Sequence, residues 1–396
     1  GSGKSSIINS VNGLAVRYDG ASIDGSIRIG NKDIKNLKLY EISMLVSSVF
    51  QNPKTHFFNV NTTLELLFYL ENIGLDKEEM DRRLGKMLEV FPIKHLLNRD
   101  IFELSGGEKQ ILCIAASYIS GTEIIVLDEP SSNLDEENIK VIKEMLAQLK
   151  DMGKTIIISE HRIFYLMDII DRIFLIKNGE IQREYTKIDF MKLSTKKLNE
   201  LGLRDKIKTK LTVPEIQNSG SFNVKNIEFK FNGVDNKLLF KNISFEMGKI
   251  YGIVGTNGLG KSTLLRCLIG CERKSKDEIY LDGKRLSKTD RVKISSLVMQ
   301  DVNHQLFTES VLDEVLISQP TEKEEEAKKI LSEVGLETFC DRHPMSLSGG
   351  QKQRLALACA IASRLSILLL DEPTSGLDRL QMHAVAKILN RLKEEG

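Results

Sequence analysis

Two glycine-rich loops in this sequence have the residue types needed to bind phosphate groups. The complete loop, Gly255–Thr263, follows an apolar run, Ile250–Val254, that predicts a β-strand leading into it. The backbone N–H groups of such a loop curl around phosphates, and the start of the following helix adds partial positive charge. Lys261 is expected to reach the β- and γ-phosphates, and the hydroxyl of Ser262 to bind Mg²⁺. The sequence opens on a shorter version of this loop. In the first loop we expect nucleotide to be bound by Gly1, Ser2, Gly3, Lys4, Ser5 and Ser6. In the second loop we expect it to be bound by Asn257, Gly258, Gly260, Lys261, Ser262 and Thr263.

Two pairs of carboxylates stand at the ends of apolar runs that predict buried parallel strands. The pairs are Asp128 with Glu129 and Asp371 with Glu372, each followed by proline. The aspartate at the end of such a strand, beside the phosphate-binding loop, can hold Mg²⁺ through water. The glutamate can act as the general base that orients and polarises an attacking water. These motifs predict Mg²⁺-dependent hydrolysis of ATP, with Glu129 and Glu372 as catalytic residues.

The motifs occur twice, in the same order. Leu-Ser-Gly-Gly and Leu-Asp-Glu-Pro each recur at an offset of 243 residues, and Gly-Lys-Ser recurs at an offset of 257 residues. A repeat of this size indicates duplicated domains rather than a solenoid. Alternation of strands and helices predicts an α/β fold with a mostly parallel sheet in each copy. We predict a first nucleotide-binding domain over residues 1–185, a Lys-rich linker over 186–221 and a second nucleotide-binding domain over 222–396.

Both ends of the sequence fall inside these predicted domains. No strand precedes the first phosphate-binding loop, and the second copy stops before any counterpart of Ser159-Glu160-His161. We therefore expect the sequence to be a piece of a longer protein.

Composition restricts the class of protein. Lys and Arg number 56 against 55 Asp and Glu, so the sequence has no global basic field that would indicate a nucleic-acid partner. No apolar run approaches the roughly 18–20 residues that cross a bilayer. Five scattered cysteines and the lack of a secretory leader favour a reducing, cytosolic location. If the function involves a membrane, its spanning segments are expected in another chain.

Leu-Ser-Gly-Gly-[Glu/Gln]-Lys-Gln, about 20 residues before each Asp-Glu pair, resembles the signature of the ABC ATPase family. The resemblance covers essentially the whole chain, twice, and implies a helical signature subdomain in each copy. It implies that two cassettes pack head to tail, with ATP between the phosphate-binding loop of one and the signature of the other. Donors at a helix start suit the γ-phosphate. By this resemblance the site of Lys261 would be completed by Ser105, Gly106 and Gly107, and the site of Lys4 by Ser348, Gly349 and Gly350.

Other family elements are found at single positions. Gln51 and Gln300 match the Q-loop glutamine, which contacts nucleotide and senses Mg²⁺ and the attacking water, and His161 matches the switch histidine that contacts the γ-phosphate. Phe231 could stack on adenine or belong to the core. The residues thereby expected at the two metal sites are Ser5, Gln51 and Asp128, and Ser262, Gln300 and Asp371. Ile111 departs from the family by replacing the Arg found at Arg354 after the second signature.

Three further segments resemble the energy-coupling-factor group of vitamin and metal-ion importers: Val49–Pro53, Met299–Phe307 and Ser159–Arg162. This resemblance implies a peripheral protein on the cytoplasmic face of the cell membrane, beneath an integral scaffold protein and a substrate-binding membrane protein. Residues 52–61 and 301–309 would be the docking surface, although their apolar side chains could instead pack inside the cassette. Tandem cassettes also act on the ribosome, and related ATPases repair DNA, but the long inserts of those proteins are not present here.

Overall fold

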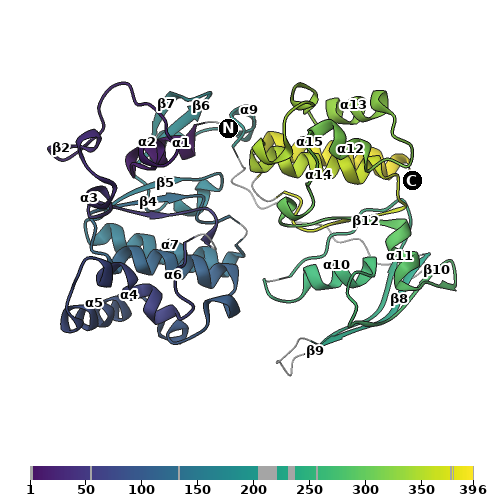
Figure 1. The fold of residues 1–396 in the computed structure, drawn as a ribbon, viewed down its shortest axis with the longest axis horizontal. Coiled ribbons are helices and arrows are strands. Elements are labelled where there is room, and N and C mark those ends of the chain that lie inside the picture. The colour runs from purple at the N-terminus through teal and green to yellow at the C-terminus, as the bar shows by residue number, and fades with distance from the viewer. Residues whose placement is uncertain are drawn as a thin grey trace. The chain divides into compact units, whose positions relative to one another are not determined.

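The structure is a computed structural model that divides into two compact units, Gly1–Lys206 and Ile207–Gly396 (Figure 1). The residues that it describes are 3–53, 56–132, 134–203, 221–230, 237–255, 257–374, 377 and 379–395. Among these residues, no helix is both long enough and apolar enough to cross a membrane.

Unit 1 is built on a parallel sheet with the order β3-β4-β5. The strands are β3 (Val46–Val49), β4 (Ile124–Asp128) and β5 (Thr155–Ser159). Ile125, Val126 and Leu127 are completely buried because helices cover both faces of the sheet, as expected for a central parallel strand. The three strands bring Gln51, Asp128 and the turn after Ser159 to one edge of the sheet, since parallel strands end on the same side.

Helices lie on both faces of this sheet (Figure 1). Helix α1 (Lys4–Val11) packs on β4 and β5, and α6 (Gly106–Ile119) and α7 (Glu136–Asp151) cover the opposite face. Helix α6 is apolar on nearly all sides and buries Leu112 and Ile114, each contributing about 1.5–3 kcal/mol by its removal from water. The helical layer continues with α4 (Thr62–Asn72) and α5 (Lys77–Val90). The smaller elements of this unit are α2 (Leu14–Arg17), β1 (Arg28–Ile29), β2 (Lys32–Asp33) and α3 (Leu39–Ser43).

The last part of unit 1 is a hairpin covered by two short helices. The hairpin consists of β6 (Arg172–Lys177) and β7 (Glu180–Thr186), and α8 (Lys187–Met191) and α9 (Thr195–Glu200) follow it. Phe190 and Leu198 are completely buried in a cluster with Tyr185. Residues 187–200, which fell in the predicted linker, therefore fold as part of unit 1.

Unit 2 contains a short parallel pair and a separate antiparallel sheet. The parallel pair is β12 (Ser295–Val298) with β13 (Ile367–Leu370), in register from Ser295 with Ile367. The antiparallel sheet has the order β11-β10-β8-β9. Its strands are β8 (Phe222–Lys230), β9 (Lys237–Phe245), β10 (Lys276–Leu281) and β11 (Lys284–Arg285).

The helices of unit 2 repeat the arrangement of unit 1. Helix α10 (Lys261–Ile269) lies on one side of β12 and β13, and α14 (Gly349–Ala362) lies on the other side (Figure 1). The remaining helices are α11 (Lys288–Ile294), α12 (Val311–Leu316), α13 (Glu324–Glu333) and α15 (Arg379–Glu395). Both units are thus α/β, as predicted, although the four-stranded sheet of unit 2 is antiparallel.

One predicted strand is absent. Ile250–Val254 forms neither strand nor helix, and Val254 is mostly exposed. A strand exists only through its hydrogen bonds to a neighbour, and no strand in the described part of unit 2 pairs with this segment. The segment is apolar, but its local sequence pattern does not determine whether it pairs with a neighbouring strand.

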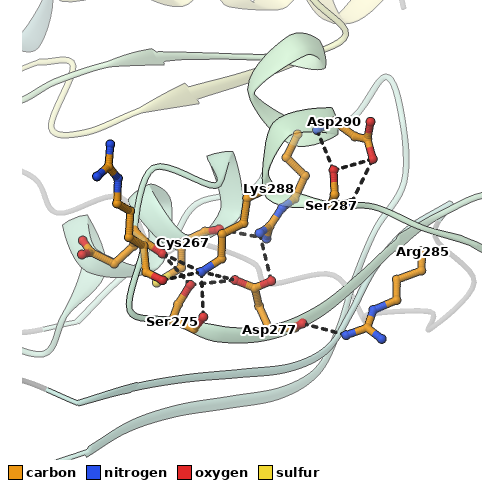
Figure 2. A network of polar contacts seen from close by, with 10 residues as sticks. Cys267, Ser275, Asp277, Arg285, Ser287, Lys288 and Asp290 are labelled. Carbon is orange, nitrogen blue, oxygen red and sulfur yellow. Dashed lines mark hydrogen bonds and ion pairs between the residues drawn. The ribbon is translucent and has the colours of Figure 1, made fainter.

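The C-terminal end of α10 is fixed by a network of polar contacts with α11 (Figure 2). The completely buried guanidinium of Arg291 donates to the Cys267 carbonyl at 3.0 Å and to Asp277 Oδ1 at 2.9 Å. The ammonium of Lys288 donates to three backbone carbonyls, of which that of Ser275 is 2.7 Å away. A side chain at Gly270 would place its Cβ 2.5 Å from the Lys288 carbonyl oxygen, so glycine permits this close packing. The helix that begins at Lys261 is therefore held in place at its C-terminal end.

Candidate active site

Each phosphate-binding loop turns into its helix through a glycine in the left-handed region. Gly3 has φ 92° before α1, and Gly260 has φ 85° before α10. A Cβ on Gly260 would also lie 2.3 Å from Leu238 Cδ1. Glycine is needed here because other residues adopt this conformation at a cost of about 1–2 kcal/mol. The turn places Lys4 and Lys261 as the first residues of their helices.

In unit 1 the structure brings Lys4, Glu129 and His161 together. The Lys4 ammonium lies 3.0 Å from His161 Nε2, and the same ring nitrogen lies 3.1 Å from Glu129 Oε1. A single imidazole nitrogen either accepts a hydrogen bond or donates one. His161 Nε2 can therefore accept from Lys4 or donate to Glu129, but not both at once.

The Q-loop glutamine contacts the carboxylate of the Asp-Glu pair in both units. Gln51 Nε2 donates to Glu129 Oε2 at 3.1 Å, and Gln300 Nε2 donates to Glu372 Oε2 at 3.0 Å. Both glutamates have positive φ, 46° for Glu129 and 50° for Glu372. Such a conformation is strained for glutamate and is typical of functional sites. The same strained geometry in both copies indicates that the position of the carboxylate matters.

The aspartate at the end of β4 has an oxygen that suits a divalent cation. Asp128 Oδ1 is buried, and no hydrogen-bond partner for it is found among the described residues. Mg²⁺ prefers carboxylate and hydroxyl oxygens together with water, which is the chemistry of Asp128 and Ser5. The described residues contain no group of three or more His, Cys, Asp or Glu that could hold a metal ion by themselves.

The signature segments lie at helix starts in both units. Ser105 caps α6 by accepting from the Glu108 N–H at 3.2 Å, and the Ser105 N–H donates back to Glu108 at 2.8 Å. A Cβ at Gly107 would lie 2.3 Å from Asn138 Cγ, so this glycine serves packing against α7. The space around Gly106 is open to 4 Å, which leaves its backbone accessible to a ligand.

Unit 2 repeats this pattern with its own contacts. The Ser348 N–H donates to Gln351 at 2.8 Å, Gly349 faces open space and Gly350 packs against Gln381. Lys261 Nζ donates to the Gly255 carbonyl at 2.8 Å. Thr263 is buried, whereas its counterpart Ser6 is exposed, so the two hydroxyls differ in access.

Several predicted site residues remain predictions. Gly1, Ser2 and Phe231 lie outside the described residues. The pairing of each signature with the loop of the other unit, and the metal sites of both units, also remain predictions.

Sequence reasoning missed three glutamates that organise the loops near the site. Glu65 and Glu314 are buried and accept backbone N–H groups from the segments that follow Gln51 and Gln300. Glu160 joins the His161 turn to Ser131. The only available signal was that Glu65 and Glu314 each lie fourteen residues after a Q-loop glutamine.

Comparisons with known proteins agree with this geometry. A family model described as ABC transporter matches residues 1–132 and 240–375. A Treponema denticola protein named as an ABC transporter ATP-binding protein is 40% identical over 406 residues, which cover 100% of this chain and 82% of that protein. One from Methanosarcina mazei, similarly named, is 31% identical over 100% of this chain and 80% of that protein. A structure described as ribosome-bound archaeal Pelota and ABCE1 aligns over 100% of this chain and 66% of that chain, with TM-score 0.66 and 21% identity, which shows the fold alone. The chain belongs to the ABC transporter family and is an ATP-hydrolysing member that carries two ABC cassettes in tandem.

Proposed function

We propose that this chain is the ATP-hydrolysing subunit of a membrane importer of the energy-coupling-factor type, which takes up a vitamin or a metal ion. Its membrane partners would be an integral scaffold protein and a substrate-binding protein, and it would lie on the cytoplasmic face of the membrane. The observation that carries this proposal is a pair of exposed phenylalanines, Phe58 and Phe307, that follow the two Q-loop glutamines at the same spacing.

The two phenylalanines are presented to solvent rather than packed in the core. Phe58 is 76% exposed and Phe307 is 75% exposed. Their neighbours in sequence are the residues that pack inward: Leu306 is buried, and Phe57 packs against the core of unit 1. The alternative that the apolar side chains of these segments pack inside the cassette is therefore wrong for Phe58 and Phe307, and is confirmed for Phe57 and Leu306. An exposed aromatic side chain at a fixed position suits an anchor for a partner.

Each phenylalanine stands on a turn that a buried carboxylate holds in place. Glu65 Oε2 accepts the N–H groups of Phe58 at 3.0 Å and Asn59 at 2.7 Å. Glu314 Oε2 accepts those of Phe307 at 3.0 Å and Thr308 at 2.9 Å. Burying a carboxylate is costly unless it is well hydrogen-bonded, so these turns are preorganised rather than adaptable.

The turn of unit 2 borders a groove of about 270 Å³ between α12 and α14. Leu306, Phe307, Ile317 and Cys359 contribute to its lining. The lining also includes the polar residues Gln305, Glu314 and Ser318. A groove of this mixed character beside an exposed aromatic residue fits the end of an amphipathic helix, which is the element we propose that the membrane scaffold contributes.

These turns are also close in sequence to the chemistry. Gln300 contacts the catalytic carboxylate Glu372 and precedes Phe307 by seven residues. A shift of Gln300 when the nucleotide changes would therefore move the turn that carries Phe307. This gives hydrolysis a short physical connection to a partner bound at the groove.

For hydrolysis, we propose that Glu129 and Glu372 each accept a proton from the attacking water. Lys4 and Lys261 would bind phosphate, and His161 would contact the γ-phosphate. Mg²⁺, when bound, would neutralise phosphate charge next to the aspartate of each Asp-Glu pair. The signature serines and glycines would complete each site from the opposite cassette.

The test is isolation of the native complex in detergent, with the chain tagged and either Phe58→Glu or Phe307→Glu introduced. Phe174→Glu on β6 is the matched control, because Phe174 is partly exposed but distant in sequence from both turns. We expect the wild-type chain and the control to co-purify with an integral membrane protein, and both docking variants to lose it. Binding of ATP and the melting temperature of the isolated chain should stay unchanged.

Recovery of ribosomes or DNA in place of a membrane protein would contradict the importer assignment. A wild-type complex that tolerates both charge substitutions would instead show that the phenylalanines are not the anchors.

A further inference from the structure

One carboxylate in unit 1, that of Glu160, connects two turns that are far apart in sequence. Its Oε2 accepts the N–H of His161 at 2.8 Å and the N–H of Arg162 at 3.4 Å. Its Oε1 accepts the N–H of Ser131 at 3.3 Å and also the Ser131 hydroxyl. The turn that carries His161 is thereby tied to the turn that follows Glu129.

Two neighbouring side chains support this connection. The Tyr165 hydroxyl donates to Glu160 Oε1 at 3.3 Å. Burial, with the Glu160 charge as the next cause, raises the pKa of Tyr165 well above its usual value, so this hydroxyl remains a donor at physiological pH. The Arg162 guanidinium donates to the Leu134 carbonyl at 3.4 Å, which joins the same two segments a second time.

The connection through Glu160 sets the distance between the His161 imidazole and the Glu129 carboxylate. Glu129 is two residues before Ser131, and His161 directly follows Glu160. His161 Nε2 lies 3.1 Å from Glu129 Oε1. Ser131 is 1% exposed, so the end of the connection at Ser131 is packed inside the protein.

We propose that Glu160 is a positioning residue for ATP hydrolysis. It holds the His161 turn against the Ser131 turn, so that the imidazole stays in register with the Glu129 carboxylate. This inference rests on the proposed roles of Glu129 and His161. Glu160 acts through the backbone of its neighbours, because its oxygens are occupied by N–H and O–H donors from the protein itself.

A glutamine cannot replace this carboxylate, although it has the same shape. If its oxygen takes the place of Oε2, its NH₂ group faces the Ser131 N–H. If its oxygen takes the place of Oε1, its NH₂ group faces the N–H groups of His161 and Arg162. In either orientation a donor meets a backbone donor, so one side of the connection is lost.

The test compares steady-state ATP hydrolysis of the purified full chain with Glu160→Gln. All proteins carry Glu372→Gln, so that turnover reports on the site that contains Glu129. Glu71→Gln, at an exposed position of α4, is the control for removing a carboxylate. Ser131→Ala, which removes one donor, and Ser131→Thr, which retains a hydroxyl as at Thr374 in the second cassette, test the other end of the connection.

We expect Glu160→Gln to lower kcat roughly 10–100-fold, the scale seen when reacting groups are misplaced by about 1 Å. The KM for ATP and the melting temperature should stay close to those of the Glu71→Gln control. Ser131→Ala should also lower kcat, and Ser131→Thr should keep kcat close to that of the protein with Ser131. In the double variant Glu160→Gln, Ser131→Ala, the fold-loss in kcat should be smaller than the product of the two separate fold-losses.

An unchanged kcat in Glu160→Gln would overturn the inference, and so would a loss that merely follows a lowered melting temperature. His161→Ala separates this result from a failure of the proposed function. If His161→Ala lowers turnover and Glu160→Gln does not, only the positioning role is wrong. If His161→Ala has no effect, the proposed role of His161 is wrong and the inference falls with it.

Discussion

Glu372 Oε2 accepts a hydrogen bond from Gln300 Nε2 at 3.0 Å, and the first cassette repeats this bond between Gln51 and Glu129. The glutamine therefore lies against the carboxylate in both copies. A group in this position can report on whatever occupies the space next to the carboxylate.

Replacing both carboxylates by amides should stop hydrolysis without preventing binding. In the Glu129→Gln, Glu372→Gln double variant we expect turnover to fall about 10²–10⁴-fold, because a positioned general base is lost. ATP should remain bound, since the two lysines are unchanged. Steady-state hydrolysis and retention of labelled ATP measure the two quantities. Turnover near that of the wild type would refute the base assignment.

The positive φ of Glu372 predicts that a glycine variant at this position is more stable than an alanine variant. Glu372→Gly and Glu372→Ala both remove the carboxylate, but only glycine adopts φ 50° without strain. We expect the glycine variant to be more stable than the alanine variant by about 1 kcal/mol. At Glu144, in the middle of α7, the order should reverse by roughly 0.5–1 kcal/mol. Urea titrations of the four variants check both signs.

The two signature glycines of the first cassette should respond differently to alanine. Gly107→Ala would bring a Cβ within 2.3 Å of Asn138 Cγ and should lower the free energy of unfolding by about 1–3 kcal/mol through overpacking. Gly106→Ala meets no atom within 4 Å and should leave stability unchanged. If the Gly106 backbone binds phosphate, turnover should fall in this second variant. Equal destabilisation by both substitutions would contradict the packing argument.

The buried ion pair of the second cassette predicts a marked non-additivity. Arg291→Ile alone should cost up to about 3–5 kcal/mol, because it leaves the Asp277 carboxylate with only the more distant Lys288 ammonium, at 3.9 Å, as its cation. Adding Asp277→Ala should recover much of that loss. Nine residues before Gln51, at the spacing of Arg291 from Gln300, the first cassette has the buried Ile42, so this position accepts a hydrocarbon. Thermal unfolding of the single and double variants measures the coupling.

Much of the fold and the site could be predicted from the sequence because it rests on local patterns. Glycine spacing, apolar runs and the repeat located α1 and α10, the strands β4 and β5, and the Asp-Glu pairs. The α/β class and the duplicated cassettes are confirmed. These features depend on the types of a few residues that are close together in the sequence, so a single sequence is enough to predict them.

The remainder depends on contacts between distant residues. Ile250–Val254 has the composition of a strand, but pairing with a neighbour decides whether a strand forms. Glu160 and Glu314 resemble surface glutamates in the sequence, and only the folded chain shows the backbone groups that they accept. The positive φ of Glu129 likewise has no sequence signal, because glutamate rarely adopts it.

The Arg291–Asp277 pair has a consequence for the history of the duplication. Copies within one gene can be made alike again by recombination between them. A crossover between the codons for Asp277 and Arg291 would separate the two charges. It would leave either a buried guanidinium without its carboxylate, or Asp277 with only the Lys288 ammonium at 3.9 Å, and we expect the product to be less stable. We therefore expect selection to keep the two residues together, whereas the buried Ile42 of the first cassette imposes no such requirement. By this argument, a buried charge pair of this kind would select against recombination that makes the two halves of the chain alike.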